Sequence, residues 1–289
     1  MTLKTDEGFT VISTGEETKN ADGTWTLTAR NVRDFAIIAG NHFAVYSEEV
    51  DGVKINSWYY DFLDGNRQFG ETALKAAVDS VKAYTQAYGK YPYATLDVVE
   101  SAYDYGGLEY PTMVRIADLY GAEMELKEEG AGDSLRMSVA HEVAHQWFYG
   151  VVGNDQYAQA WLDESFATYS ECVYEAYTGT PEAEILAEID ATEADCAETF
   201  TDRYIDLSYG DYSDETQYVT AVYRVGKVFL YRLRQTLGEE KFDGFMKQWY
   251  DTNKFGIVTT QDFKTQLLAY CGDDADVKKL LDKYIGSQT

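Results

Sequence analysis

The spacing of hydrophobic and polar positions changes along the chain. Up to about Tyr60, hydrophobic and polar residues alternate in short runs such as WTLT at residues 25–28. The dipeptides Asp22-Gly23 and Asp51-Gly52 separate these runs and are typical of tight hairpin turns. We therefore predict short β-strands over residues 1–62. Because this stretch is too short for a complete β-sandwich, it is interpreted as the C-terminal strands of a truncated β domain.

Beyond residue 62 the pattern becomes helical. Between Gly70 and Tyr88 apolar residues recur three or four positions apart, which predicts a helix that ends at Gly89. Two strands are predicted next, over residues 95–99 and 112–116, on either side of an irregular segment.

The C-terminal half is predicted to be helical. Helices are expected over residues 133–149 and 162–177, and several more follow Pro181, separated by glycines. The order of strands, mixed elements and helices predicts an α+β fold with a second domain over residues 63–289.

Charge and cysteine content exclude several classes of function. The 289 residues include 50 acidic and 24 basic side chains, a net charge of -26 at pH 7. Such a surface repels a phosphate backbone, so we expect no nucleic-acid partner. The three cysteines form no C-x-x-C pair, which argues against a zinc finger or a disulfide framework.

No segment predicts a membrane span, because no run of 18 apolar residues occurs. The start, MTLKTDEGFT, lacks the apolar region of a signal peptide and is interpreted as the start of an excised fragment. We therefore expect missing domains in a longer parent protein. Its localisation stays open between an exported or cell-surface bacterial protein and a cytoplasmic one.

The sequence His141-Glu142-Val143-Ala144-His145 falls inside a predicted helix. Side chains four positions apart lie on one face of a helix, so both imidazoles can reach one metal ion. Glu142 points away from that shared axis and can act as general base on a water at the metal. The chain has only 3 histidines and two of them form this motif, which makes a chance occurrence a poor explanation.

A third ligand is predicted in the next helix. Glu164 follows His145 by 19 positions, within the segment WLDESFAT. Two imidazoles and one carboxylate leave the fourth position of a tetrahedral zinc ion open, which is the geometry of a catalytic site. We therefore predict one Zn²⁺. Thr168, one turn beyond Glu164, is expected to hydrogen-bond a ligand.

Four short segments carry a family resemblance. They are GGLEY from Gly106, HEVAHQWFYG from His141, WLDESFATY from Trp161 and VYRVGK from Val222. In this order and spacing they resemble the motifs of the aminopeptidase N-like family of gluzincin zinc peptidases, from about residue 70 to residue 270. The resemblance implies a thermolysin-like catalytic domain preceded by a β domain, of which only the tail is present.

Site roles follow from the resemblance by matched position. It implies that His141, His145 and Glu164 bind zinc and that Glu142 activates water. Tyr223 would stabilise the oxyanion of the tetrahedral intermediate, as a preorganised donor does. The alternative for Tyr223 is a packing role, since the chain has 25 tyrosines.

The GGLEY segment is implied to bind the substrate. Glu109 would hold the free amino terminus, and Gly106 and Gly107 would let the substrate backbone approach closely. A plain turn is the alternative for the two glycines.

Three departures from the family pattern bear on these roles. Leu108 and Tyr110 replace a methionine and an asparagine, which alters the amine-binding corner. Ser165 stands where glycine is usual, and Val225 stands where a lysine is usual, with Lys227 two positions further on.

These observations predict a zinc metallopeptidase with peptide substrates, acting as an aminopeptidase through zinc-activated water and a glutamate base. Two alternatives stay open at this point. One is an endopeptidase on the same scaffold, for which Glu109 has no amine to bind. The other is a non-catalytic peptide-binding module that retains the metal site.

Overall fold

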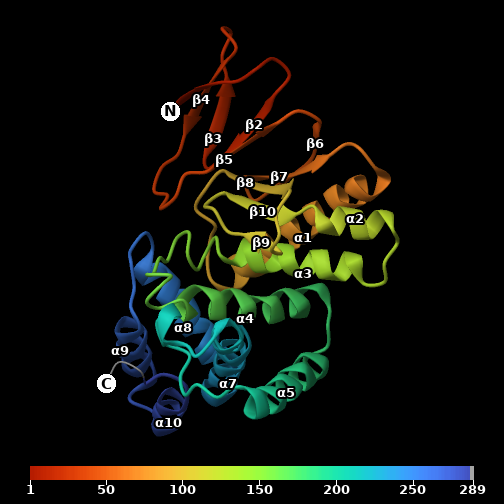
Figure 1. Cartoon of the computed structure of the whole chain (residues 1–289). Helices are drawn as coiled ribbons and strands as arrows, with labels where there is room; N and C mark the ends of the chain where they lie inside the picture. Colours follow the sequence, from red (N-terminus) through yellow and green to blue (C-terminus); the bar gives the residue numbers. More distant parts are fainter. Residues whose placement is uncertain (287–289) are drawn as a thin grey trace. The chain divides into compact units, whose positions relative to one another are not determined.

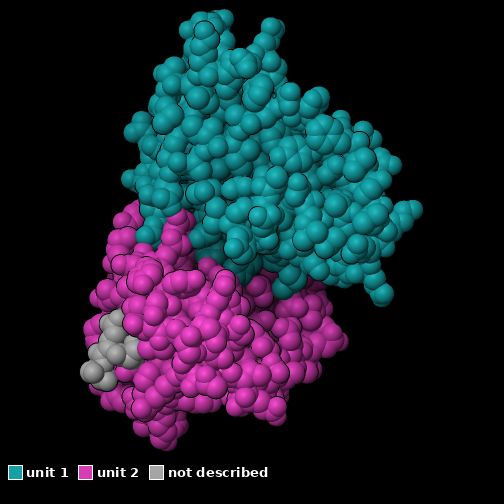
Figure 2. All heavy atoms as spheres, viewed as in Figure 1, with its two compact units in different colours: residues 1–82, 91–146 teal, residues 83–90, 147–289 magenta. Residues whose placement is uncertain are grey.

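The computed structural model describes residues 1–286, and its helices and strands are shown in Figure 1. Contacts divide the chain into two compact units, which Figure 2 distinguishes by colour. The first contains residues 1–82 and 91–146, and the second contains residues 83–90 and 147 onward. None of the helices within residues 1–286 has both the length and the apolar character needed to cross a membrane.

A five-stranded sheet is the largest sheet of the first unit. Its strands are β6 (Phe43–Val50), β7 (Val53–Tyr60), β8 (Thr95–Ser101), β10 (Met113–Ala117) and β9 (Gly107–Leu108), in that spatial order. The central pairs β7–β8 and β8–β10 are parallel, and the outer pairs are antiparallel. Strand β8 is buried on both faces, as expected for a central parallel strand.

Helices connect or follow the strands of this sheet, and one of them packs against it. Helix α1 (Asp64–Ala87) joins β7 to β8, because parallel neighbours need a long crossover connection. Helices α2 (Leu119–Glu125) and α3 (Ala131–Ala144) follow β10, and α3 packs against β9 and β10.

The N-terminal residues form strands, as predicted. A three-stranded sheet contains β1 (Thr2–Lys4), β4 (Thr24–Thr28) and β3 (Glu16–Lys19), in that spatial order. A two-stranded sheet pairs β2 (Thr10–Ser13) with β5 (Ile37–Gly40). Asp51 and Gly52 connect β6 to β7 with φ values of 50° and 82°, the positive pair that a type I′ hairpin requires. The five-stranded sheet contains strands from both sides of residue 62, and the predicted division into 1–62 and 63–289 stays a prediction.

The second unit is helical. Its α-helices are α4 (Trp161–Thr178), α5 (Glu182–Thr199), α6 (Glu215–Val219), α7 (Gly226–Leu237), α8 (Glu239–Asn253), α9 (Thr260–Cys271) and α10 (Ala275–Tyr284). Between them lie a 3₁₀ turn, η1 (Tyr209–Asp211), and a π-helical segment, η2 (Thr220–Val225). The ring centroid of Phe263 lies 5.1 to 5.8 Å from the ring centroids of four other aromatic residues, which are Trp161, Phe166, Phe245 and Trp249. All five side chains of this aromatic cluster are buried.

One predicted helix ends earlier than expected. The helix predicted over residues 133–149 ends at Ala144, so His145 lies at its C-terminal cap and not in mid-helix. A tight turn follows, in which the N–H of Val152 donates to the carbonyl of Trp147 and the N–H of Tyr149 donates to the carbonyl of Val152. Tyr149 adopts a φ of 119°, which is incompatible with a continuing helix.

Three carboxyl groups are withdrawn from water in the first unit. Asp97 accepts hydrogen bonds from Asn56 and Trp58, yet burial raises its pKa to about 6. Burial, together with the nearby Asp97, raises the pKa of Glu17 to about 7. Burial likewise raises the pKa of Glu100 to about 7. All three carboxyl groups therefore keep their protons to a higher pH than exposed carboxyl groups do.

We predict that Glu17→Gln stabilises the protein near neutral pH. The folded-state pKa of Glu17 lies above its unfolded value, so its favourable contribution is present in acid and is lost as the pH rises through about 7. Glutamine removes the ionisation and its repulsion from Asp97. At pH 7.5 the melting temperature should rise by about 2–4 °C, or roughly 1 kcal/mol, whereas at pH 4.5 it should change little.

The matched control is Glu16→Gln, an exposed carboxylate on the same strand. It should give the same small change at both pH values. A Glu17→Gln variant that melts below the wild type at pH 7.5 would contradict the assignment.

Candidate metal centre

His141 and His145 lie one turn apart at the end of α3. Their Nε2 atoms are 3.2 Å apart, close enough to face one ion. His141 is half-buried and His145 is 1% exposed. The neighbouring Val143 and Ala144 are buried, so packing of the helix fixes the direction in which the two imidazoles point.

Glu164 lies in the first turn of α4, which is held in place by its neighbours. The indole Nε1 of Trp161 donates to the hydroxyl of Thr260 at 2.9 Å. The fully buried Asp163 accepts from the backbone N–H of Glu164 at 2.7 Å. Thr168 donates to the backbone carbonyl of Glu164 at 2.7 Å. The predicted hydrogen bond of Thr168 is thus to the Glu164 backbone, a common pattern in helices.

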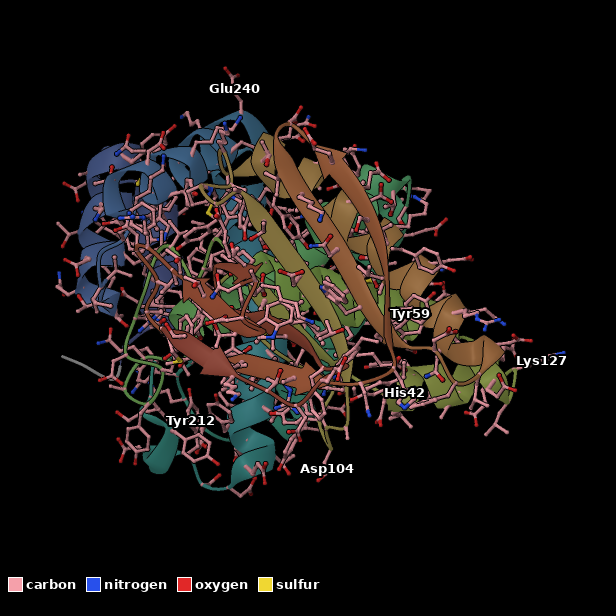
Figure 3. The ribbon with its side chains drawn as sticks, turned by 90° about the horizontal axis from the view of Figure 1, so that it is seen from above. His42, Tyr59, Asp104, Lys127, Tyr212 and Glu240 are labelled. Carbon is pink, nitrogen blue, oxygen red and sulfur yellow. The ribbon has the colours of Figure 1, made fainter. Side chains whose placement is uncertain are left out.

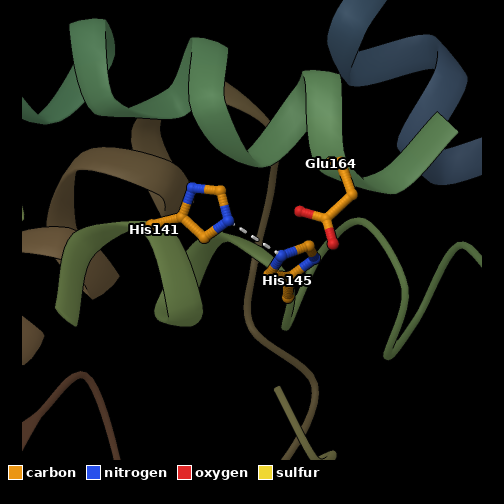
Figure 4. Close-up of side chains that lie close together, drawn as sticks. All are labelled: His141, His145 and Glu164. Atoms are coloured by element: carbon orange, nitrogen blue, oxygen red, sulfur yellow. Dashed lines mark hydrogen bonds between the residues drawn. The ribbon is translucent and has the colours of Figure 1, made fainter. Parts of the chain in front are cut away.

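The two histidines and Glu164 form a group that can hold a metal ion (Figure 4). One nitrogen of each imidazole and one carboxylate oxygen of Glu164 all lie within 4.8 Å of one another. Two nitrogens and one carboxylate oxygen are the donor set of three-ligand zinc sites. The donor set and its spacing fit one zinc ion with a coordination position left open.

Glu142 lies against the strand that carries the GGLEY segment. Its side chain is 7% exposed, and a Cβ atom added to Gly107 would overlap it. Gly107 is therefore required for β9 to pass this close to Glu142. A Cβ on Gly106 would meet only the hydroxyls of Tyr120 and Ser138, at 3.3 and 3.5 Å, so this position is less constrained.

Glu109 directly follows the edge strand β9 and is half-buried. The loop before this strand carries Tyr103 and Asp104 (Figure 3). Burial raises the pKa of Tyr103, and the Glu109 and Glu142 carboxylates add to the increase. These three side chains therefore share one electrostatic environment. The Arg115 guanidinium lies over the Tyr103 ring at 4.5 Å and keeps this environment from being wholly acidic.

Gln146 is a positioning residue near the candidate site, and sequence reasoning assigned it no role. Its amide is fully buried, accepts from the N–H of Thr112 at 2.7 Å and donates to the carbonyl of Tyr110 at 3.0 Å. It thus fixes the residues that follow Glu109 to the end of the helix that carries both histidines. The only signal in the sequence is its position next to His145.

Tyr223 lies in the π-helical segment η2, beside Glu164. Burial, followed by the Glu164 carboxylate, raises the pKa of Tyr223 well above its ordinary value, so its phenol stays protonated. Segments of π-helix are frequent at functional sites, because the extra residue in the turn changes where a side chain points.

Two residues of the second unit hold η2 against α4. Ser165, which replaces the usual glycine, donates from its Oγ to the carbonyl of Val222 at 2.6 Å. Gly226 leaves no room for a Cβ beside Ser165. The serine therefore has a positioning role next to Tyr223, which the sequence did not reveal.

Lys227 does not take the place of the missing lysine of the family motif. It is 8% exposed, and its ammonium pairs with Glu188 at 2.7 Å and with Glu171 at 3.6 Å. These ion pairs link α7 to α5 and α4, which is a structural function.

Comparison with known proteins decides the family. The model of the peptidase family M1 domain matches residues 72–284. The chain belongs to peptidase family M1. The predicted membership of the aminopeptidase N-like gluzincin peptidases is thereby confirmed.

Curated relatives of this M1 chain include leucine aminopeptidase 2 of Candida albicans and of Aspergillus niger. The Candida protein is 29% identical over 196 residues, and the Aspergillus protein is 27% identical over 207 residues. The matched regions cover 60% and 69% of this chain. They cover only 30% and 31% of the relatives, so the chain spans about a third of their length.

Solved structures confirm the predicted α+β fold of an M1 catalytic domain. An M1 zinc metallopeptidase from Deinococcus radiodurans superposes with a TM-score of 0.77 at 20% identity. The superposition covers 100% of this chain and 63% of that one. The family and the His-His-Glu group together bear out Zn²⁺ as the expected cofactor.

Metal binding should depend on the two histidines of α3. Replacing His141 or His145 with alanine removes one of three ligands, and the apparent Kd for zinc should rise at least about 100-fold. Zinc content after dialysis, measured by mass spectrometry, checks this. The matched control is His42→Ala, the third histidine of the chain, which should keep its zinc. Equal zinc content in all three variants would place the metal elsewhere.

Proposed function

We propose that this M1 chain is the zinc-dependent catalytic part of an aminopeptidase, which removes N-terminal residues from peptides. The observation that carries the proposal is the His-His-Glu group, with the buried Glu142 next to the first histidine in the helix. A three-ligand zinc site with a neighbouring carboxylate can activate water for hydrolysis of a peptide bond. The family supports the same reaction class.

In this proposal Glu142 moves the protons. A zinc ion held by the three ligands supplies Lewis-acid chemistry, which polarises the scissile carbonyl and makes water more acidic. Glu142 accepts the proton of the attacking water and delivers it to the leaving amine. Its position against β9 supports this role, since a substrate paired to that edge strand would pass close to its carboxylate.

Tyr223 is proposed to stabilise the oxyanion that forms during attack. A phenol that stays protonated is a hydrogen-bond donor, and a fixed donor aimed at developing negative charge lowers the barrier. The contact between Ser165 and the carbonyl next to Tyr223 supports a fixed position.

Glu109 is proposed to bind the free amino terminus of the substrate. It follows the edge strand β9, and its carboxylate acts on Tyr103 together with that of Glu142. A carboxylate at this place attracts the ammonium group and restricts cleavage to the first peptide bond. Gly106 and Gly107 are proposed to let the substrate backbone approach β9. The curated relatives named leucine aminopeptidase favour this reading over an endopeptidase.

The amino terminus should be required for cleavage. The zinc-loaded chain should cleave a short peptide with a free amino terminus and leave the N-acetylated peptide intact, because Glu109 has no cation to bind in the second case. Chromatography of the products measures both rates. Equal rates would mean an endopeptidase, and the role of Glu109 would then be wrong.

Glu142→Gln should abolish turnover without loss of zinc. The amide cannot accept the water proton, so kcat should fall at least about 100-fold. Zinc content should match the wild type, because Glu142 is not a ligand. Retained turnover would remove Glu142 from the mechanism. A wild-type chain that binds zinc and peptide but never cleaves would instead indicate a binding module.

A further inference from the structure

A cavity within the helical unit is lined by residues of α4, α5, α7 and α8 and of the end of α1. Figure 1 labels these helices. The volume of the cavity is about 330 Å³, which is within the range of small-ligand sites. Buried residues line its floor, among them Tyr169, Cys172 and Ile185. Tyr169 lies five residues after Glu164 and so about 140° further round α4. The cavity is thus not on the face of α4 that carries the metal ligand.

The hydroxyl of Tyr169 is a polar group that lacks a protein partner. The residue is 3% exposed and lines the cavity, and its ring packs against Phe242 at 5.4 Å. Among residues 1–286 no hydrogen bond is formed by this hydroxyl. Burial raises the pKa of Tyr169 well above its ordinary value, so the group offers an O–H donor. The hydroxyl of an otherwise buried residue that lines a cavity is available to a ligand that enters it.

Asp243 and Lys247 lie one helical turn apart on α8 and line the same cavity. Neither forms a hydrogen bond or an ion pair with any described residue, although they influence each other electrostatically. Asp243 is half-buried and Lys247 is exposed. Burial raises the pKa of the Asp243 carboxyl, and the nearby Arg234 and Lys247 offset part of this increase. A carboxylate and an ammonium group that face one cavity without pairing can each bind an opposite charge of one ligand.

The remaining charges of the cavity are already paired. Arg234 contacts Glu182 at 2.7 Å and Glu239 at 2.9 Å, and the phenol of Tyr231 donates to Glu182 at 2.6 Å. Three carboxylates and two cations line the cavity, a formal sum of -1. This balance disfavours a simple anion and suits a ligand that carries its own positive charge.

We propose that this cavity binds a free α-amino acid with an apolar side chain, as a zwitterion. Its ammonium group pairs with Asp243, its carboxylate with Lys247 and the Tyr169 hydroxyl, and its side chain lies on the floor formed by Cys172 and Ile185. The proposal rests on residues of the second unit alone and holds whether or not the chain is an aminopeptidase.

The test is a titration of the full zinc-loaded chain with L-leucine, followed through the Ile185 methyl resonance by NMR. A saturable shift with a Kd of about 1 mM or tighter is expected. Leucinamide, which lacks the carboxylate, and N-acetyl-leucine, which lacks the ammonium, should each bind at least about tenfold more weakly. Equal binding of all three compounds would overturn the proposal.

Variants assign the binding to the cavity. Asp243→Asn should weaken leucine binding about tenfold or more, and Tyr169→Phe should weaken it severalfold. Glu240→Gln, on an exposed position of the same helix (Figure 3), should bind as the wild type does. His145→Ala should also bind leucine normally at Ile185, since the cavity does not use the metal group. The absence of a saturable shift in the wild type would refute the site. So would a shift that is lost in His145→Ala but fully retained in Asp243→Asn.

Discussion

The amide of Gln146 is the contact on which the candidate site of the first unit depends. It holds the backbone of Tyr110 and Thr112 at the end of α3, and so sets the distance between the histidines and the GGLEY segment. The constraint is strong enough to keep Thr112 in a left-handed conformation, with a φ of 63°. A β-branched residue avoids this region at a cost of about 1–3 kcal/mol. Thr112 is held from its other side too, because its hydroxyl accepts the N–H of Gly15 at 2.7 Å.

A comparable contact orders the second unit. Ser165 follows Glu164 in α4 and donates to the carbonyl that precedes Tyr223, so one short hydrogen bond fixes the segments that carry Glu164 and Tyr223 relative to each other. The absence of a Cβ at Gly226 allows the approach. The replacement of glycine by serine in the family motif is therefore accompanied by a specific new bond. This replacement does not weaken the proposal that Tyr223 stabilises the oxyanion.

The candidate metal ligands could be selected from the sequence, and the structure brings them together, because their geometry is largely local. His141 and His145 depend only on helical periodicity, and Glu164 depends on a second short motif. Gln146 and Ser165 could not be predicted in the same way, since their partners lie 34 and 57 residues away in the chain. The predicted end of α3 was also wrong by several residues. Its early end depends on hydrogen bonds of the following turn, which compete with helical ones and leave no periodic signal.

The excess of acidic residues shapes how cations are paired in the helical unit. The chain has 24 basic residues against 50 acidic ones, and three cations of the helical unit each serve two carboxylates. Lys227, Arg232 and Arg234 each contact two, at distances between 2.6 and 3.6 Å. Lys247 has Asp243 one turn away and pairs with no described residue. Lys247 is exposed and Asp243 is half-buried, so water solvates both charges in the free chain. The proposed zwitterion would replace that water, and the Tyr169 hydroxyl, which lines the same cavity, would add a third polar contact.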